Sequence, residues 1–173
     1  VTDDAWITAL ENQMAETGIA IAHARLEFTA RLQAACETSD HTHFPLAHFK
    51  VTGSLEEILE HAPAVEVEDT FKYNLKQSRP RDAIVGGAVS GPHKSDLAVR
   101  YAAKNMAADQ CSTGEQKALL IGLILAHARL IKAERGTAPI LLLDEVAAHL
   151  DETRRAALYD ILIELNAQVW LTG

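Results

Sequence analysis

One stretch of the sequence, residues 111–151, constrains the fold more than any other. It contains an apolar run at 118–131 and four further apolar residues at 140–143, which end directly on Asp144 and Glu145. A short apolar run that closes on two acids predicts a fully buried parallel strand whose carboxyl end delivers the acids to a site. Mg²⁺ is usually held by one or two carboxylates plus phosphate oxygens, and a second acid can orient a water. The pattern therefore indicates a nucleotide-hydrolysing core.

A second strand is predicted just after these acids. Asp151 can cap a helix, and residues 168–172 form the next strand, which gives a strand–loop–helix–strand unit that should be parallel and right-handed. Thr172 would then lie at a strand end beside Asp144 and Glu145, where it could sense phosphate or merely end the strand. The apolar side chains expected on the core face of the helix are Leu158, Ile161, Leu162 and Leu165.

The start of the preceding helix has two interpretations that do not exclude each other. Ser112 is followed three residues later by Glu115, which is a capping box and a sufficient local reason for both residues. The same helix start, predicted at Gly114 and running to about Ala133, would present free backbone N–H groups and a positive dipole end to a phosphate. Gly136 ends the helix.

The first part of the chain predicts a long helix, capped by Thr2 or Asp3 and running to about Cys36. A seven-residue spacing indicates a helix that packs on one partner along a narrow seam, as in half of an antiparallel coiled arm, although a bundle helix fits the pattern equally well. We predict a helical arm subdomain over residues 1–88 and an α/β part over 89–173. The apolar residues that recur at this spacing are Ile7, Met14, Ile21, Phe28 and Ala35.

Between these regions, residues 67–77 predict a helix that begins the most basic segment of the chain. Its charges could meet phosphates, but a solvated helix face is the commoner outcome. Gly91-Pro92 predicts a tight turn that exposes His93 and Lys94. The basic residues of the segment are Lys72, Lys76, Arg79 and Arg81.

Composition narrows the classes of protein. The net charge is −8, so the surface as a whole does not have the positive charge that favours binding to nucleic acid. Contact with DNA would need a local basic patch or sequence outside this chain. Two distant cysteines, Cys36 and Cys111, favour a reducing compartment, with the cytoplasm as the default. No apolar run is long enough to span a membrane. The chain begins Val-Thr-Asp-Asp without an initiator Met or a signal peptide, and we interpret it as a fragment of something longer.

Four motifs in order resemble the RecF family, bacterial DNA replication and repair ATPases and recombination mediators related to ABC and SMC proteins. Residues 111–116 resemble the ABC signature, 142–145 resemble Walker B, 148–151 resemble the D-loop, and 91–97 match a Gly-Pro-His segment of the family. The resemblance covers nearly the whole chain, which corresponds to the C-terminal half of the family. It implies an α/β fold: the C-terminal part of an ABC-type P-loop ATPase lobe, preceded by a helical arm subdomain.

The resemblance also implies an activity, cofactors and partners. Family members use ATP and Mg²⁺, form a homodimer on ATP binding, and bind duplex DNA and single-strand/double-strand junctions. They help to load RecA with RecR and RecO at gaps, in DNA recombination and the SOS response.

Site residues are implied by position in the motifs. Asp144 would hold Mg²⁺ through water, Glu145 would be the catalytic base, and Asp151 would cross the dimer interface. Thr172 would sit at the switch position. The residues implied to bind ATP in trans, from the signature loop, are Ser112, Thr113, Gly114 and Glu115.

The sequence departs from the family pattern in three places. Thr113 replaces a glycine of the signature, and Val146 replaces the proline that follows Walker B in transporters. No glycine is followed directly by lysine, so the chain has no G-x-x-x-x-G-K phosphate loop, and alone it is expected not to hydrolyse ATP. Two alternatives stay open: another ABC or SMC-like ATPase, and a non-catalytic interaction module.

Overall fold

The computed structural model describes residues 4–39, 42–146 and 150–172. The chain forms two compact units: unit 1 comprises residues 1–29 and 50–98, and unit 2 comprises 30–49 and 99–173. Three elements contribute residues to both units. These are helix α1 (Asp4–Glu37), strand β1 (Ala47–Thr52) and strand β2 (Asp96–Tyr101). The domain division at residue 88 stays a prediction.

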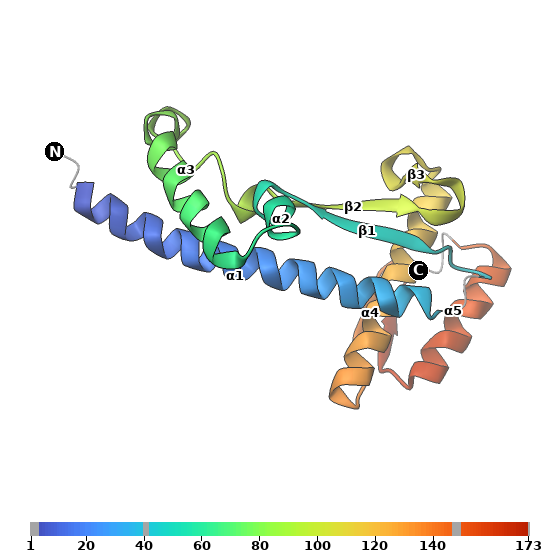
Figure 1. Cartoon of the computed structure of the whole chain (residues 1–173). Coiled ribbons are helices and arrows are strands. Elements are labelled where there is room, and N and C mark those ends of the chain that lie inside the picture. The colour runs from blue at the N-terminus through green and yellow to red at the C-terminus, as the bar shows by residue number, and fades with distance from the viewer. Residues whose placement is uncertain (1–3, 40–41, 147–149, 173) are drawn as a thin grey trace. The chain divides into compact units, whose positions relative to one another are not determined.

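Unit 1 is built on the first part of α1, with α2 (Ser54–Leu59) and α3 (Ala64–Val85), and α2 packs against α3 (Figure 1). Helix α3 is longer than the predicted 67–77. It continues through Pro80 and ends at Gly86, whose left-handed φ of 80° lets the chain leave the helix. The buried core of the unit contains Ala15, Ile19, Ala22, Leu55, Val67, Phe71 and Leu75.

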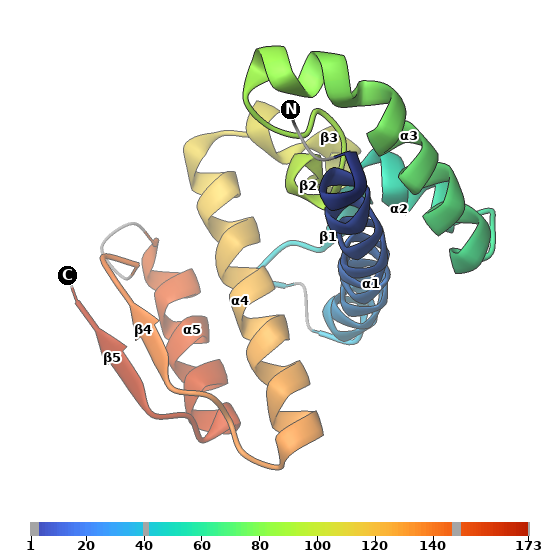
Figure 2. The ribbon, with the colours of Figure 1, turned by 90° about the vertical axis from the view of Figure 1, so that its left-hand side faces the viewer.

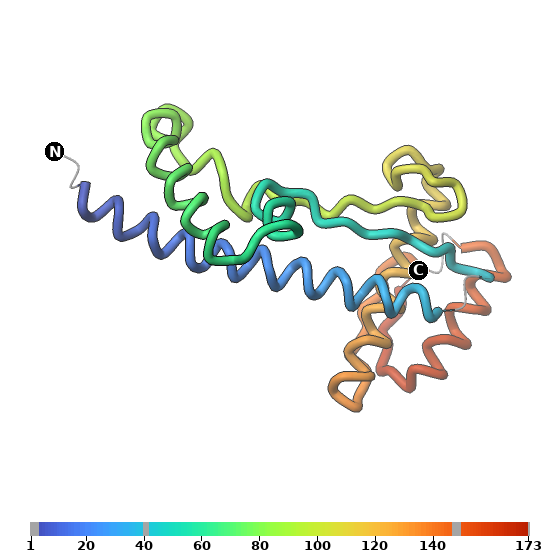
Figure 3. The backbone as a smooth tube through the Cα atoms, in the orientation of Figure 1, coloured from blue at the N-terminus to red at the C-terminus, as the bar shows by residue number. Residues whose placement is uncertain are grey.

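The seam predicted on α1 is not the one that unit 1 buries. Met14 and Ile21, from the seven-residue series, are 40% and 44% exposed, whereas Ala15 and Ala22 are fully buried. The helix is unbroken through Gly18 (Figure 3). Small side chains explain the choice, because they let other segments approach the helix backbone closely. The predicted packing along the Met14 series is therefore wrong for unit 1, and the buried seam is the one lined by small residues.

The basic segment of α3 is partly neutralised by the first turns of α1. The Arg79 guanidinium donates to both carboxylate oxygens of Glu11 at 2.6 Å and to Thr8 Oγ1 at 2.8 Å, and it also pairs with Asp4. These bonds to Glu11 raise the pKa of Arg79. Lys72 pairs with Glu68 in the same helix. Arg79 therefore joins two helices, so it does not serve as an open phosphate contact.

The predicted turn at Gly91-Pro92 is present, and a buried acid anchors it. Gly91 has φ 140°, a conformation that favours glycine. Glu56 is fully buried and accepts a hydrogen bond of 2.8 Å from Ser95 Oγ. The exposed His93 ring places Nε2 2.8 Å from the carbonyl oxygen of Ala88, so this ring bonds back to the chain.

Unit 2 contains α4 (Thr113–Arg135), α5 (Glu152–Leu165) and the parallel strands β4 (Leu141–Leu143) and β5 (Val169–Leu171). Figure 2 shows α4 and α5 side by side, with the two strands next to them. The predicted parallel pairing is confirmed, with Leu142 opposite Trp170. The buried core side chains include Ile121, Leu125 and Ala128 from α4, Leu141 and Leu143 from β4, and Leu158, Leu162 and Leu165 from α5.

The prediction that the strand at 140–143 is fully buried is wrong. Leu141 and Leu143 are buried, but Leu142 is 76% exposed and Trp170 on the partner strand is 63% exposed. Successive side chains of a strand point to opposite faces of the sheet. One face therefore meets the helices of unit 2, and the described residues leave the other face uncovered.

A second sheet has the order β1-β2-β3, where β3 (Met106–Ala107) pairs antiparallel with β2. Asn105 has a left-handed φ of 47° and closes the turn that leads from β2 to β3. Among the described residues, no helix is long and apolar enough to cross a membrane.

Candidate functional site

The start of α4 carries the capping box predicted from the sequence. Ser112 is the N-cap, and its Oγ accepts a hydrogen bond from the backbone N of Glu115 at 3.4 Å. The Glu115 carboxylate returns the interaction, since Oε2 accepts from the Ser112 backbone N at 3.0 Å and from Ser112 Oγ at 2.8 Å. These bonds satisfy backbone donors that every helix start leaves free.

The same helix start is open to solvent. Ser112, Thr113 and Gly114 are all exposed, and a Cβ atom built on Gly114 would have no neighbour within 4 Å. The remaining N–H groups of the first turn and the positive end of the helix dipole can therefore be reached by an anion from outside. This geometry allows phosphate capture as well as capping.

Glu115 has a further partner that sequence reasoning missed. Lys104, in the short η2 helix (Ala102–Lys104), forms an ion pair with Glu115 Oε1. This pairing, followed by the two hydrogen bonds from Ser112, lowers the pKa of Glu115 to about 2. The two residues lie eleven positions apart in different elements, and no spacing rule relates them.

A second cluster lies at the carboxyl ends of β4 and β5, where the Thr172 hydroxyl links the two acids. Thr172 Oγ1 donates to Asp144 Oδ1 and accepts from the backbone N of Glu145 at 3.0 Å. The backbone N of Thr172 also donates to the carbonyl oxygen of Leu143 at 3.1 Å. The structure thus brings together the three residues expected to meet at this strand end.

The backbone turns sharply at Glu145, which has a φ of 52°. Left-handed conformations are uncommon outside glycine, asparagine and aspartate, and such strain tends to occur at functional sites. The Thr172 hydroxyl helps to hold this conformation through its bond to the Glu145 backbone. Asp144 and Glu145 are both exposed, so their carboxylates can be reached from solvent.

The donor set fits a hydrated Mg²⁺ that is shared with phosphates. Asp144 and Thr172 offer hard oxygen ligands, which Mg²⁺ prefers. Within the described ranges, no group of three or more His, Cys, Asp or Glu side chains gathers to hold a metal. A metal held here would therefore need water and phosphate oxygens to complete its coordination, as expected for Mg²⁺ with a nucleotide.

Asp151 is the N-cap of α5, as predicted. Its Oδ1 accepts from the backbone N of Arg154 at 2.8 Å, and Oδ2 lies 3.7 Å from Arg154 Nε. Asp151 is exposed, and its role at a dimer interface stays a prediction. Ala148 and His149, which precede it in the motif that resembles a D-loop, lie outside the described residues.

The two clusters lie at the same end of unit 2. Helix α4 and strand β4 are consecutive and run in opposite directions, so the start of α4 and the end of β4 point the same way (Figure 2). They remain separate groups, one built on Ser112 and Glu115 and the other on Asp144, Glu145 and Thr172. This arrangement suits two distinct contact sites.

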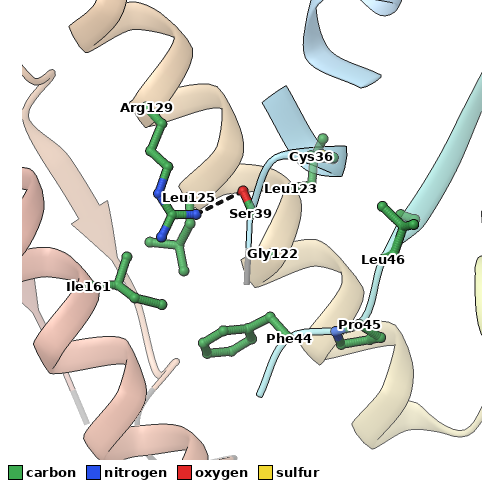
Figure 4. A pocket seen from close by; sticks show the side chains of 11 residues that line it. Cys36, Ser39, Phe44, Pro45, Leu46, Gly122, Leu123, Leu125, Arg129 and Ile161 are labelled. Atoms are coloured by element: carbon green, nitrogen blue, oxygen red, sulfur yellow. Dashed lines mark hydrogen bonds between the residues drawn. The ribbon is translucent and has the colours of Figure 1, made fainter. Parts of the chain in front are cut away.

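A cavity elsewhere in unit 2 is too small to hold a nucleotide. Its volume is about 20 Å³, room for about one water, and Arg129 Nη1 donates to Ser39 Oγ at 3.0 Å at its edge (Figure 4). Burial raises the pKa of the Cys36 thiol beside it to about 11, and Glu37 adds to the shift. A thiol that stays protonated at neutral pH is not a reactive nucleophile.

Comparison with known proteins gives a consistent result, although no protein-family model matches the chain. The protein named DNA replication and repair protein RecF from Mesorhizobium japonicum is 53% identical over 172 residues, which is 99% of this chain and 45% of that protein. Its namesakes from Brucella abortus and Agrobacterium fabrum are 51% and 49% identical. The chain spans less than half the length of these relatives.

Solved structures share the fold. The structure of the recombination mediator protein RecF-ATP in the RecFOR pathway matches 99% of this chain and 45% of its own, with a TM-score of 0.78 and 20% identity. A structure of the same protein with ATPrS matches with the same TM-score. The mixed fold of helices and strands predicted from the sequence is therefore confirmed, and the chain shares it with part of these RecF structures.

Proposed function

Because the chain resembles RecF proteins over 99% of its length, we propose that it is the C-terminal part of a RecF-type DNA repair and recombination ATPase. In the longer protein, ATP would bring two copies together and hydrolysis would release them. The observation that carries this proposal is the pair of clusters at one end of unit 2, an open helix start and a linked pair of acids, on a fold that also occurs in ATP-bound RecF.

Each cluster would have its own part in handling ATP. The exposed start of α4 would contact the γ-phosphate held by the other copy, through Ser112, Thr113 and Gly114. An open first turn with free N–H groups supports this role. If the helix start of each copy contacts the ATP held by the other copy, ATP binding and dimer formation each favour the other.

The acids would act on the nucleotide bound in their own copy. Asp144 would hold Mg²⁺ through water, and Glu145 would take a proton from the attacking water. Bound Mg²⁺ would neutralise charge on the phosphates. The Thr172 hydroxyl supports these roles, because it fixes the Asp144 carboxylate and the Glu145 backbone relative to each other. Thr172 would also respond to the phosphate, and Asp151 would contact the other copy.

The partners follow from the same proposal. The protein would bind duplex DNA and single-strand/double-strand junctions at gaps and help to load RecA with RecR and RecO, in the cytoplasm. With a net charge of −8 and Arg79 engaged by Glu11, the main DNA-binding surface would come from the rest of the longer protein.

Replacing Ser112 tests the signature role. In the full-length protein, Ser112→Arg should abolish ATP-induced dimerisation, measured by analytical ultracentrifugation, because a long side chain would fill the open helix start. Ser54→Arg, at the exposed start of α2, is the matched control and should dimerise normally. Normal dimerisation of the Ser112 variant would overturn the proposal.

Replacing Glu145 tests the acids. Glu145→Gln should leave ATP-induced dimerisation intact and slow ATP hydrolysis by about 10²–10⁴-fold, the range for loss of a general base. Glu152→Gln, at an exposed glutamate in the first turn of α5, should hydrolyse ATP at the normal rate. The 173-residue chain alone should show no turnover. Turnover in that chain that Glu145→Gln abolished would contradict the need for a separate phosphate loop.

A further inference from the structure

The two oxygens of the Glu115 carboxylate have different partners. Oε1 pairs with the Lys104 ammonium, whereas Oε2 accepts hydrogen bonds from the backbone N and the hydroxyl of Ser112. Ser112 therefore gives its hydroxyl proton to a carboxylate whose charge Lys104 balances. The lysine and the serine are linked through one side chain.

This linkage matters if a phosphate approaches Ser112. To bind a phosphate oxygen, the hydroxyl must turn its proton away from Glu115 and toward the phosphate. An unbalanced carboxylate would oppose this twice, since it accepts the proton more strongly and repels the incoming negative charge. A cation on the other oxygen of the carboxylate reduces both effects.

We propose that Lys104 is a positioning residue for the signature contact: by neutralising Glu115 it frees the Ser112 hydroxyl to donate to the γ-phosphate of ATP. This inference rests on the proposed function of the Ser112 helix start. Lys104 acts through Glu115 and need not touch the nucleotide.

The setting of Lys104 suits this role. It ends η2, and the next residue, Asn105, has a left-handed φ of 47° that turns the chain immediately after it. The Lys104 ammonium also lies 5.6 Å from the centre of the Tyr101 ring, a second favourable contact for a cation. The nearby cation Arg100 is occupied, because its guanidinium bonds to the carbonyl and side-chain oxygens of Asn105.

Stability alone does not account for the pair. The Lys104 side chain is 48% exposed, and ion pairs so open to water contribute little to folding. A balanced charge beside a phosphate contact would affect ATP binding far more than unfolding. This difference separates a positioning role from a structural one.

The test uses charge removal and charge rescue in the full-length protein. Lys104→Met should raise the ATP concentration for half-maximal dimerisation by about tenfold, the order expected for one unbalanced charge near the phosphate. Glu115→Gln keeps a residue type that capping boxes accept and removes the charge that Lys104 balances, so in this background Lys104→Met should change the ATP requirement little. The double variant should recover most of the affinity lost by Lys104→Met.

Two controls accompany the rescue. Lys104→Arg keeps the charge and should dimerise at the normal ATP concentration, and Lys117→Met removes a partly exposed lysine of α4 and should have no effect. Thermal unfolding without ATP should change little for Lys104→Met, Lys104→Arg and Lys117→Met.

The outcomes distinguish this inference from the proposed function. If Ser112→Arg blocks dimerisation but Lys104→Met leaves the ATP requirement unchanged, the role of Lys104 is refuted and the proposed function stands. A Lys104→Met defect that persists in the double variant would show that the lysine acts other than through Glu115, which also refutes the inference. If Ser112→Arg dimerises normally, both fail.

Discussion

The close approach of Gly18 and Phe71 gives a sharp test of how unit 1 is packed. A Cβ atom on Gly18 would lie 3.0 Å from Phe71 Cε1 and 3.5 Å from Pro92 Cδ. Favourable contacts between carbon atoms are about 3.5–4.0 Å long. Gly18→Ala therefore forces the Phe71 ring to move by several tenths of an ångström, although this ring is almost fully buried.

Two opposing effects decide the magnitude. Alanine stabilises a helix interior by about 1 kcal/mol relative to glycine. Overfilling a packed core costs about 1–3 kcal/mol. The buried ring has little room to shift, so we expect the cost to exceed the gain and the free energy of unfolding to fall by about 1 kcal/mol.

Urea unfolding of the 173-residue chain, followed by circular dichroism, measures this change. In a Phe71→Leu background, which removes the ring atom nearest to Gly18, the same Gly18→Ala change should become stabilising by up to about 1 kcal/mol. Ala24→Gly, on the exposed side of α1, should lose about 1 kcal/mol from helix propensity alone. If Gly18→Ala stabilises the unaltered chain, or has the same effect in both backgrounds, the inferred contact is absent.

Three further predictions concern unit 2. The pKa of Glu115 is lowered from 4.5 to about 2 in the folded chain, so its ionic bonds stabilise the fold above pH 4.5 and are lost as the pH falls toward 2. The difference in urea midpoint between the parent and Glu115→Gln should therefore shrink as the pH falls across this range. A difference that stays constant with pH would contradict the prediction. Asn166 ends α5 with a left-handed φ of 51°, so Asn166→Ala should destabilise the chain by about 1 kcal/mol in urea unfolding, whereas Asn166→Gly should change its stability by close to zero. An equal effect of the two substitutions would argue against backbone strain at this position. Leu158 is fully buried, so Leu158→Ala should lower the free energy of unfolding by about 3 kcal/mol. Ile163→Ala, on the exposed side of the same helix, should change it by no more than about 0.5 kcal/mol. Similar losses at both positions would refute the assigned core face of α5.

Features with local causes were predictable from the sequence. The start of α4 at Ser112 and Glu115, its end at Gly136 and the cap of α5 at Asp151 depend on side chains within a few positions of the backbone groups that they satisfy. The same holds for the turn at Asn105, a residue type that tolerates a left-handed conformation.

Features that depend on distant residues were not predictable. Two sides of helix α1 could pack against the rest of unit 1. Phe71, which is more than fifty residues from Gly18 along the chain, packs against the side that carries Gly18. The Lys104 and Glu115 pair has the same character. The exposure of Leu142 depends on which other segments cover the sheet, and the sequence pattern of a single strand does not contain this information.

The candidate site shows both cases. The acids at 144 and 145 were evident because they end an apolar run, and Thr172 followed from the parallel arrangement. The left-handed backbone of Glu145 had no local signal, since glutamate does not favour it. It became evident only with the Thr172 hydrogen bonds.

The chain passes between its two units inside helices and strands, and this limits how such a protein can be cut into parts. The passages at residues 29–30, 49–50 and 98–99 fall inside α1, β1 and β2, not in loops. A protease that needs a loose connector would find regular hydrogen-bonded backbone at each passage. Neither unit can be excised or grafted onto another protein by a single cut, so we expect the pair to be inherited and exchanged as one piece.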